Sequence, residues 1–179
     1  MPARINLSTP LSPESAARLR AGDFVHLSGT VYTARDAAHK LMTEMLARGE
    51  PPPFELEGQV VYYAGPAPAP PGMVIGSVGP TTSGRMDAYS PELIRRGLRY
   101  MIGKGLRNAE VTAAIVSGGG VYFAAIGGAA ALMSQRVTAC EVVAFPELGT
   151  EAVRRLTVRD LPLVVAVDSR GGDYYRRPN

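Results

Sequence analysis

Four short polar clusters in the sequence carry residues that could bind a small anion. Each follows a predicted strand or begins a predicted helix, and three of them contain glycine. Loops held by a rigid scaffold are where binding residues usually lie. The clusters are residues 33–40, 79–85, 103–105 and 125–130.

In the first cluster, Arg35 and His39 are four positions apart and would share one face of a helix that starts there. A guanidinium at the positive end of a helix could bind a carboxylate through two hydrogen bonds. The alternative is structural: Asp36 caps the helix, and Arg35 and His39 are ordinary exposed side chains. The residues alone favour neither interpretation.

The second cluster, Gly-Pro-Thr-Thr-Ser-Gly-Arg at 79–85, brings three hydroxyl groups and a guanidinium into one turn. Backbone N–H groups, the hydroxyls and the Arg85 side chain could converge on one oxyanion. The Gly-Lys-Ser/Thr of a Walker A nucleotide loop is absent. A plain polar turn is the alternative, but the density of donors favours anion binding.

The other two clusters are weaker signals. Lys104 lies between two glycines, which is more typical of a solvated turn than of a charge aimed at an anion. Residues 125–130 resemble a helix N-terminus opened by Gly127 and Gly128 for close backbone approach. They lack the full dinucleotide-binding fingerprint, so a cofactor-binding Rossmann domain is disfavoured.

The apolar pattern predicts the scaffold for these clusters: short strands that alternate with short helices, hence an α/β layered domain with a mixed sheet. The Pro-rich segment 65–72 is expected to be a rigid crossover inside one domain of 1–179 rather than a linker, and the tail 168–179 is polar. Expected strands are 5–7, 24–28, 59–63, 73–78, 100–102, 121–126, 137–145 and 163–167; expected helices are 12–21, 35–47, 90–96, 108–116, 129–133 and 150–156.

Charge and hydropathy exclude some classes of protein. The chain has 179 residues, a net charge of +3 and a pI near 9.2, and its basic residues are dispersed. A nucleic-acid binder would carry a dense basic stripe with aromatics between the charges, whereas a mild positive balance suits small anions. No apolar run reaches the roughly 18 residues of a membrane helix, and the N-terminus lacks the apolar segment of a signal peptide. We therefore expect a cytoplasmic protein that binds neither nucleic acid nor membrane.

The single cysteine, Cys140, excludes an internal disulfide. It also excludes a zinc or iron–sulfur site built only from cysteines of this chain. Cys140 lies in an apolar predicted strand, so we expect it to be buried and inert.

Five motifs, in this order along the chain, resemble the iron–sulfur hydro-lyase family of class I fumarases and L-tartrate dehydratases. The match is to the C-terminal region, which is a separate beta subunit in two-subunit members, and it runs from about Leu7 to Tyr174. Each motif alone is weak, and the order is what makes the resemblance specific. The motifs are residues 33–40, 76–87, 103–105, 126–130 and 145–149.

The resemblance implies a swivelling β/β/α domain and a reversible addition or removal of water on a dicarboxylic acid. It implies a [4Fe–4S] cluster that acts as a Lewis acid on the substrate. The three cysteine ligands of that cluster belong to the alpha subunit. The chain would thus match the half without the cluster, incomplete without an alpha partner, and an α2β2 assembly is expected.

The resemblance also implies roles for particular residues. Arg35 matches the arginine that holds a substrate carboxylate, and Lys104 a lysine that adds positive charge. Thr81, Thr82 and Arg85 match a loop that closes over the substrate; these residue types are in place in this chain. Thr81 is a candidate for proton transfer.

Asp36 and His39 lie beside Arg35 in the sequence. Asp36 is expected to orient Arg35 or, as a second possibility, to take part in acid–base chemistry. The expected substrate is fumarate or malate. L-tartrate, or an anion-binding module of the same fold without catalysis, is the alternative.

Overall fold

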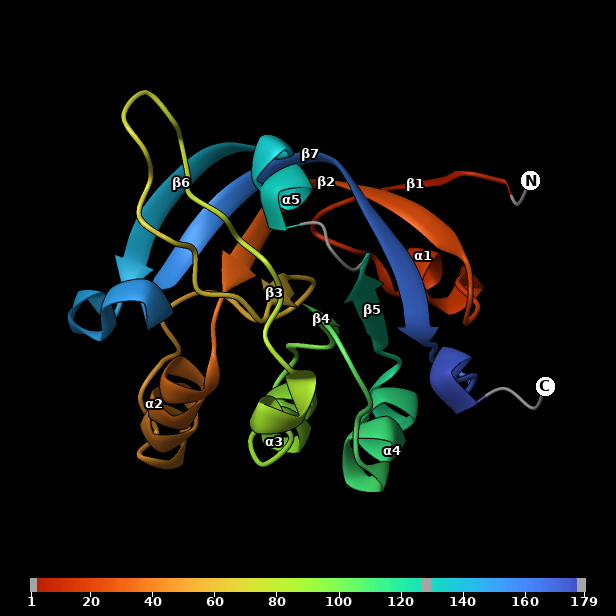
Figure 1. The fold of residues 1–179 in the computed structure, drawn as a ribbon. Coiled ribbons are helices and arrows are strands. Elements are labelled where there is room, and N and C mark those ends of the chain that lie inside the picture. Colours follow the sequence, from red (N-terminus) through yellow and green to blue (C-terminus); the bar gives the residue numbers. More distant parts are fainter. Residues whose placement is uncertain (1–2, 127–129, 177–179) are drawn as a thin grey trace.

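A computed structural model describes residues 3–126 and 130–176, which build a mixed sheet of seven strands (Figure 1). The sheet order is β1-β2-β3-β4-β5-β7-β6, and β2 also pairs with β7. This extra pairing closes five of the strands into a barrel-like ring, with β1 and β6 outside it. The strands are β1 Ile5–Ser8, β2 Phe24–Thr33, β3 Val60–Tyr62, β4 Tyr100–Gly103, β5 Val121–Ala125, β6 Val137–Ala144 and β7 Val153–Val167.

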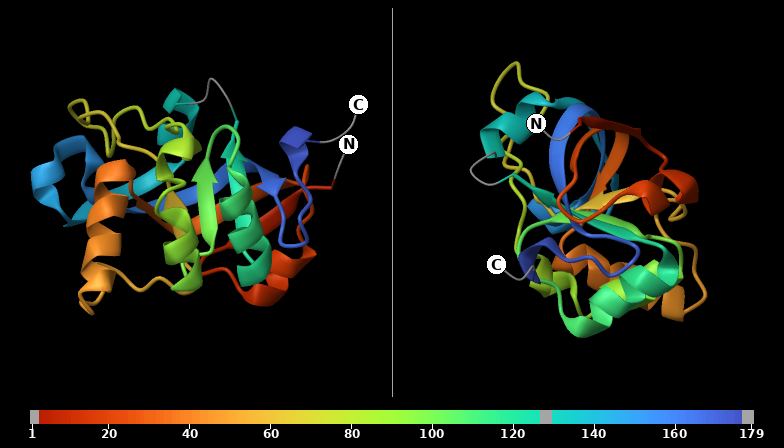
Figure 2. Two further views of the ribbon diagram at one scale, coloured as in Figure 1. Left: turned by 90° about the horizontal axis from the view of Figure 1, so that it is seen from below. Right: turned by 90° about the vertical axis from the view of Figure 1, so that its right-hand side faces the viewer.

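Three of the helices, α2, α3 and α4, lie in a row along one side of the barrel (Figure 1), and Figure 2 shows the same row from below. The row covers the outer face of the short parallel strands. The helices are α1 Pro13–Arg18, α2 Asp36–Ala47, α3 Ser90–Arg95, α4 Ala109–Gly118 and α5 Ala130–Gln135; short 3₁₀ helices span Ser83–Met86, Pro146–Glu151 and Tyr174–Arg176.

Local sequence signals set two of these helix starts. The Ser12 side chain accepts a hydrogen bond from the Ser15 backbone N–H, with Pro13 in the first turn of α1. The Asn108 side chain caps α4 in the same way, through the Val111 N–H. The predicted starts of both helices are confirmed.

The strands β2, β3, β4 and β5 are mutually parallel neighbours, so their carboxyl ends meet at one edge of the sheet. In α/β proteins, whether the parallel sheet is open or closed into a barrel, ligands usually bind at the carboxyl ends of the parallel strands. The connections that leave it carry the first three polar clusters of the sequence, so the fold gathers them on one side.

Strand residues alternate between two apolar layers, as the two-residue period of a strand requires. Val60, Tyr62 and Ile102 face the barrel interior. Tyr63 and Met101 face outward and pack beneath the helix row. The predicted mixed α/β architecture is confirmed.

The strand predicted at 73–78 is wrong. Residues 64–81 contain no regular helix or strand, and 73–78 folds back on the Pro-rich segment instead of joining the sheet. Ala67 donates its N–H to the Ser77 carbonyl at 2.9 Å, and the carbonyls of Ala67 and Pro68 fill the space that a Gly76 side chain would need. Ile75 and Val78 are buried in the core without joining a ladder, whereas Met73 and Val74 are exposed.

The helix predicted at 150–156 is also wrong. A 3₁₀ helix ends at Glu151, and the long strand β7 then begins at Val153. Val153 and Leu156 are buried and three positions apart, which is a helical spacing, but this segment pairs with β2 on one side and with β6 on the other. Pairing along both edges overrides the weak local pattern.

The remaining predicted strands and helices are present, most with small shifts at their ends. The strand β2 runs five residues beyond the predicted 24–28, and β7 begins ten residues before the predicted 163–167. The predictions that fall on residues 127–129 and 177–179 lie outside the described residues. Among the described residues, no helix is both long and apolar enough to cross a membrane.

Candidate active-site edge

Three backbone hydrogen bonds place the predicted site segments next to one another at the carboxyl edge of the parallel strands. Ala34 donates to the Tyr62 carbonyl at 3.0 Å, and Thr81 donates to the Tyr63 carbonyl at 2.7 Å. Ser83 donates to the Lys104 carbonyl at 2.9 Å. The segments that carry Arg35, the threonines and Lys104 therefore follow one another along this edge.

Arg35 occupies the N-cap position of α2, and its side chain is 25% exposed. Its Nε lies 3.6 Å from Glu151 Oε1 and its Nη2 lies 3.7 Å from Asp36 Oδ1. Both distances are too long for hydrogen bonds, and Arg35 Nε, Asp36 Oδ1 and Glu151 Oε1 are buried without a partner. Arg35 is thus held near two carboxylates but has unused donors.

Gly65, which follows β3, makes room for this arginine. A side chain on Gly65 would meet the Arg35 Cδ at 3.2 Å and the Thr150 carbonyl. Asp36 is the first helical residue of α2 and makes no capping bond, so the prediction that Asp36 caps the helix is wrong. Its place beside the Arg35 guanidinium is compatible with the orienting role, which stays a prediction.

The hydroxyl-rich segment and Lys104 are joined directly. Thr82 and Lys104 form an isolated parallel bridge, and residues 83–86 then make one 3₁₀ turn. Thr81 is half-buried, whereas Thr82, Arg85 and Lys104 are exposed. In the part of the chain that the structure describes, neither Arg85 nor Lys104 has a carboxylate within 4.0 Å. The edge therefore carries two positive charges that pair with no acid among the described residues.

His39 lies beneath Arg35 rather than beside it at the open edge. Its ring is buried and packs edge-on against Tyr63, with 5.3 Å between ring centroids. Nδ1 lies 2.8 Å from the Arg35 carbonyl oxygen, so it carries the proton. Burial lowers the pKa of His39 to about 4. The imidazole is a neutral support for the start of α2, not a group that faces a ligand.

The low pKa of His39 predicts a loss of stability in mild acid. The unfolded chain takes up a proton below the ordinary pKa of 6.5, but the folded chain does so only near 4. The contribution of neutral His39 to the free energy of unfolding should thus be fully present above pH 6.5. The free energy of unfolding should fall by roughly 3 kcal/mol as the pH drops to 4. Urea denaturation across this range should show a shallower decline for His39→Gln. The His26→Gln variant is the control, and an equal decline in wild type and His39→Gln would contradict the prediction.

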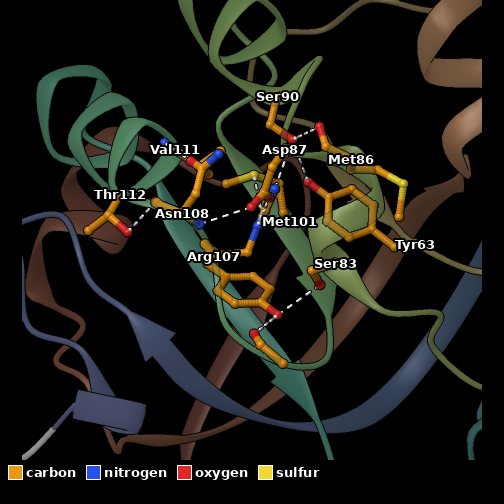
Figure 3. Close-up of polar contacts among 12 residues, drawn as sticks. Tyr63, Ser83, Met86, Asp87, Ser90, Met101, Arg107, Asn108, Val111 and Thr112 are labelled. Atoms are coloured by element: carbon orange, nitrogen blue, oxygen red, sulfur yellow. Dashed lines mark hydrogen bonds and ion pairs between the residues drawn. The ribbon is translucent and has the colours of Figure 1, made fainter.

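The sequence patterns missed Arg107, a fully buried arginine close beneath the edge. Its Nε donates to Asp87 Oδ1 at 2.7 Å and its Nη2 donates to the Ser90 hydroxyl at 2.8 Å (Figure 3). Its partners lie 17 to 20 residues earlier in the chain, and no local spacing connects them. Glu151, near Arg35, was missed for the same reason.

Ser90, where the predicted helix 90–96 begins, does not cap α3 through its side chain. It is the first residue of α3, and its hydroxyl donates to the Met86 carbonyl at 2.9 Å while accepting from Arg107.

Metal-binding side chains are not clustered in the described ranges 3–126 and 130–176, where no group of three or more His, Cys, Asp or Glu residues could hold an ion. Cys140 lies on β6 and is partly buried, and burial raises the pKa of its thiol. A raised pKa disfavours the thiolate, the form that binds metals and reacts.

Known proteins resemble this chain over nearly its whole length. The family model described as "Fumarase C-terminus" matches residues 1–177. An aerobic class I fumarate hydratase from Salmonella typhimurium is 38% identical over 97% of the chain, and fumarate hydratase 2 from Leishmania major is 39% identical over 97%. The chain spans about a third of these relatives, 31% of each. A putative L(+)-tartrate dehydratase subunit beta from Methanocaldococcus jannaschii is 40% identical, over 94% of this chain and 90% of that protein.

Proposed function

Since the chain belongs to the fumarase C-terminus family, we propose that it is the beta subunit of a hydro-lyase that interconverts fumarate and malate. The single observation that carries the proposal is the shared edge: Arg35, the Thr81–Arg85 segment and Lys104 come together at the carboxyl ends of parallel strands. Three cations around a dianion are a sound electrostatic match, since each charge-assisted contact in a closed site contributes roughly 1.5–3 kcal/mol.

Each residue has a distinct task in this proposal. The Arg35 guanidinium, whose buried Nε–H has no hydrogen-bond partner among the described residues, binds one substrate carboxylate. Arg85 and Lys104, which have no acidic partner in the described part of the chain, balance the second carboxylate and the charge that develops in the reaction. The Thr81 hydroxyl holds or moves a proton, and Asp36 orients Arg35.

A second subunit would complete the site. Thr82, Arg85 and Lys104 are exposed, and charges act strongly only where water is excluded. The described residues do not fit an iron–sulfur cluster, because they offer no set of ligands. We therefore propose that an alpha subunit covers the edge and carries the [4Fe–4S] cluster, in an α2β2 assembly in the cytoplasm. The chain would act there as one domain that swivels to close the site.

The test is an anaerobic assay of the chain alone and of the chain mixed with its alpha partner. That partner is the polypeptide that resembles the rest of the class I fumarate hydratases. The substrates are malate, fumarate and L-tartrate. We expect activity only in the mixture and highest with fumarate and malate. A preference for L-tartrate would favour the tartrate dehydratase alternative, which the M. jannaschii relative supports by its name. No turnover of any acid by a mixture with an intact cluster would refute catalysis and leave an anion-binding module.

The purified chain alone should bind no iron, because its one thiol is Cys140. The measurement is iron and acid-labile sulfide after anaerobic reconstitution with ferrous iron and sulfide, and the Cys140→Ser variant is the control. A stoichiometric cluster on the wild-type chain alone would contradict the subunit proposal.

A further inference from the structure

A buried network of two hydrogen-bonded sets, joined by a cation–π contact of Arg107 with the Tyr122 ring, links the two cation-bearing segments from below. We define it as Ser83, Asp87, Ser90, Arg107 and Tyr122. Ser83, Asp87 and Ser90 belong to the stretch that follows Thr82. Arg107 belongs to the stretch that follows Lys104. Figure 3 shows Arg107 beside Asp87, with Tyr63 near it.

Tyr122 is the one member from a separate strand, β5, and its side chain is fully buried. Its hydroxyl donates to the Gly105 carbonyl at 2.8 Å and lies 2.8 Å from the Ser83 hydroxyl. A tyrosine has one hydroxyl proton, so Ser83 must donate to it. One oxygen atom thereby links the residue after Thr82 to the residue after Lys104.

Arg107 makes the second link. Asp87 accepts from Arg107 through Oδ1 and from the Asn108 backbone N–H through Oδ2, at 2.7 and 2.9 Å. The guanidinium carbon lies 4.9 Å from the Tyr122 ring centroid and 5.2 Å from that of Tyr63. Both aromatic faces favour a cation at that distance.

These links matter because Lys104 lies in a stretch that would otherwise be loose. It is exposed, and Gly105 has a φ of +85°. Gly103 packs against Ser83 so closely that a side chain there would overlap the Ser83 hydroxyl. With contacts on both sides of Lys104, its backbone is fixed relative to the threonines. A site gains most when its charged groups are held in place before the ligand arrives.

We propose that Tyr122, supported by Arg107, is a positioning residue: its hydroxyl sets the place of Lys104 relative to the Thr81–Arg85 segment. The proposal rests on the proposed function. Tyr122 is buried and touches no substrate, so its effect on the reaction passes through the position of Lys104 relative to the threonine segment.

The test is Tyr122→Phe in the chain assembled with its alpha partner. This change removes one oxygen atom and leaves the ring in place. We expect kcat/KM to fall about tenfold, within the roughly hundredfold that a 1 Å displacement of a site can cause. Tyr100→Phe is the matched control, because Tyr100 is equally buried but faces the barrel interior, and it should keep the wild-type kcat/KM.

A double variant separates positioning from a general structural role. In a Lys104→Ala background, Tyr122→Phe should lower kcat/KM by no more than about twofold, because the residue through which it acts is gone. Wild-type kcat/KM in the single variant, or a full multiplication of the two effects in the double variant, would overturn the proposal.

Hydrogen exchange on the chain alone gives a readout that needs no activity. The Ser83 amide, bonded to the Lys104 carbonyl, should exchange faster in Tyr122→Phe, while the β5 amides keep their protection. If the wild-type assembly turns over no acid, the proposed function fails, and this exchange result then decides the positioning claim. Unchanged exchange at Ser83 would overturn it.

Discussion

Replacing Lys104 by alanine is expected to lower kcat/KM of the assembled enzyme by roughly tenfold to a hundredfold, the range of one lost charge-assisted contact. The Lys104 side chain is exposed and lacks an acidic partner in the described residues. The deletion removes no contact that the fold needs, so the unfolding midpoint of the chain should not change. Steady-state kinetics with fumarate and with malate, beside thermal denaturation, measure both effects.

The chain supplies a close control for this variant. Lys40 is its only other lysine and is also exposed, on α2. Lys40→Ala should keep wild-type kinetics, whereas Arg85→Ala should behave like Lys104→Ala. Wild-type kcat/KM in the Lys104 and Arg85 variants would show that this edge does not bind the substrate.

The candidate site could be predicted because each of its segments is contiguous in sequence. Arg35 follows a strand and starts a helix, and Thr81 and Thr82 lie between Gly79 and Gly84, with Arg85 directly after them. Because the neighbouring strands are parallel, the turns that follow them lie at the same edge of the sheet, and this placement follows from the sequence pattern alone. Lys104 is a weak signal in the sequence, and only its bridge to Thr82 places it beside the threonine segment.

The buried network could not be predicted, because its contacts join residues far apart in the chain. Ser83 and Tyr122 are 39 positions apart, and Ser90 and Arg107 are 17 apart. Arg107 looks like any surface arginine ahead of a helix. Only the packing of α3 and α4 over β4 and β5 makes it a core residue.

The two errors in the predicted fold have the same cause, because contacts between distant parts of the chain determine both segments. Apolar residues at 73–78 suit a strand, but they fold back on the Pro-rich segment and pair with no strand of the sheet. In β7, the spacing of Val153 and Leu156 suits a helix, but β2 and β6 offered ladders on both sides. Local sequence patterns predicted an element correctly where a capping residue or a glycine marks its end. They failed where pairing between segments far apart in the chain determines the structure.

Two kinds of cation therefore lie within a few residues of each other. Lys104 is exposed and has no ion-pair partner within residues 3–126 and 130–176, whereas Arg107 is buried and paired with Asp87. Removal of the positive charge should therefore have different consequences at the two positions. At Lys104 it should lower activity and leave stability unchanged, and at Arg107 it should lower stability. The environment of each charge, not its type, sets the expected effect.

Arg107→Met should lower the free energy of unfolding by about 3–5 kcal/mol, the usual effect of removing one partner of a buried ion pair. Arg107 is fully buried and the Asp87 side chain is 11% exposed, so the variant leaves a carboxylate and the Ser90 hydroxyl without their donor. Urea denaturation of the chain gives the value directly. Arg95→Met is the control: Arg95 pairs with Glu92 on the surface of α3, and its loss should change the free energy by less than about 1 kcal/mol.

The Asp87→Asn variant shows whether charge or packing carries the Arg107 effect. Asparagine keeps the shape of the side chain, and its amide oxygen can still accept from the Asn108 N–H. Added to Arg107→Met, it removes the stranded carboxylate, so the double variant should be more stable than the sum of the two single losses implies. Strict additivity would mean that the two side chains stabilise the fold independently. The ion pair would then not be what holds the Lys104 stretch against α3.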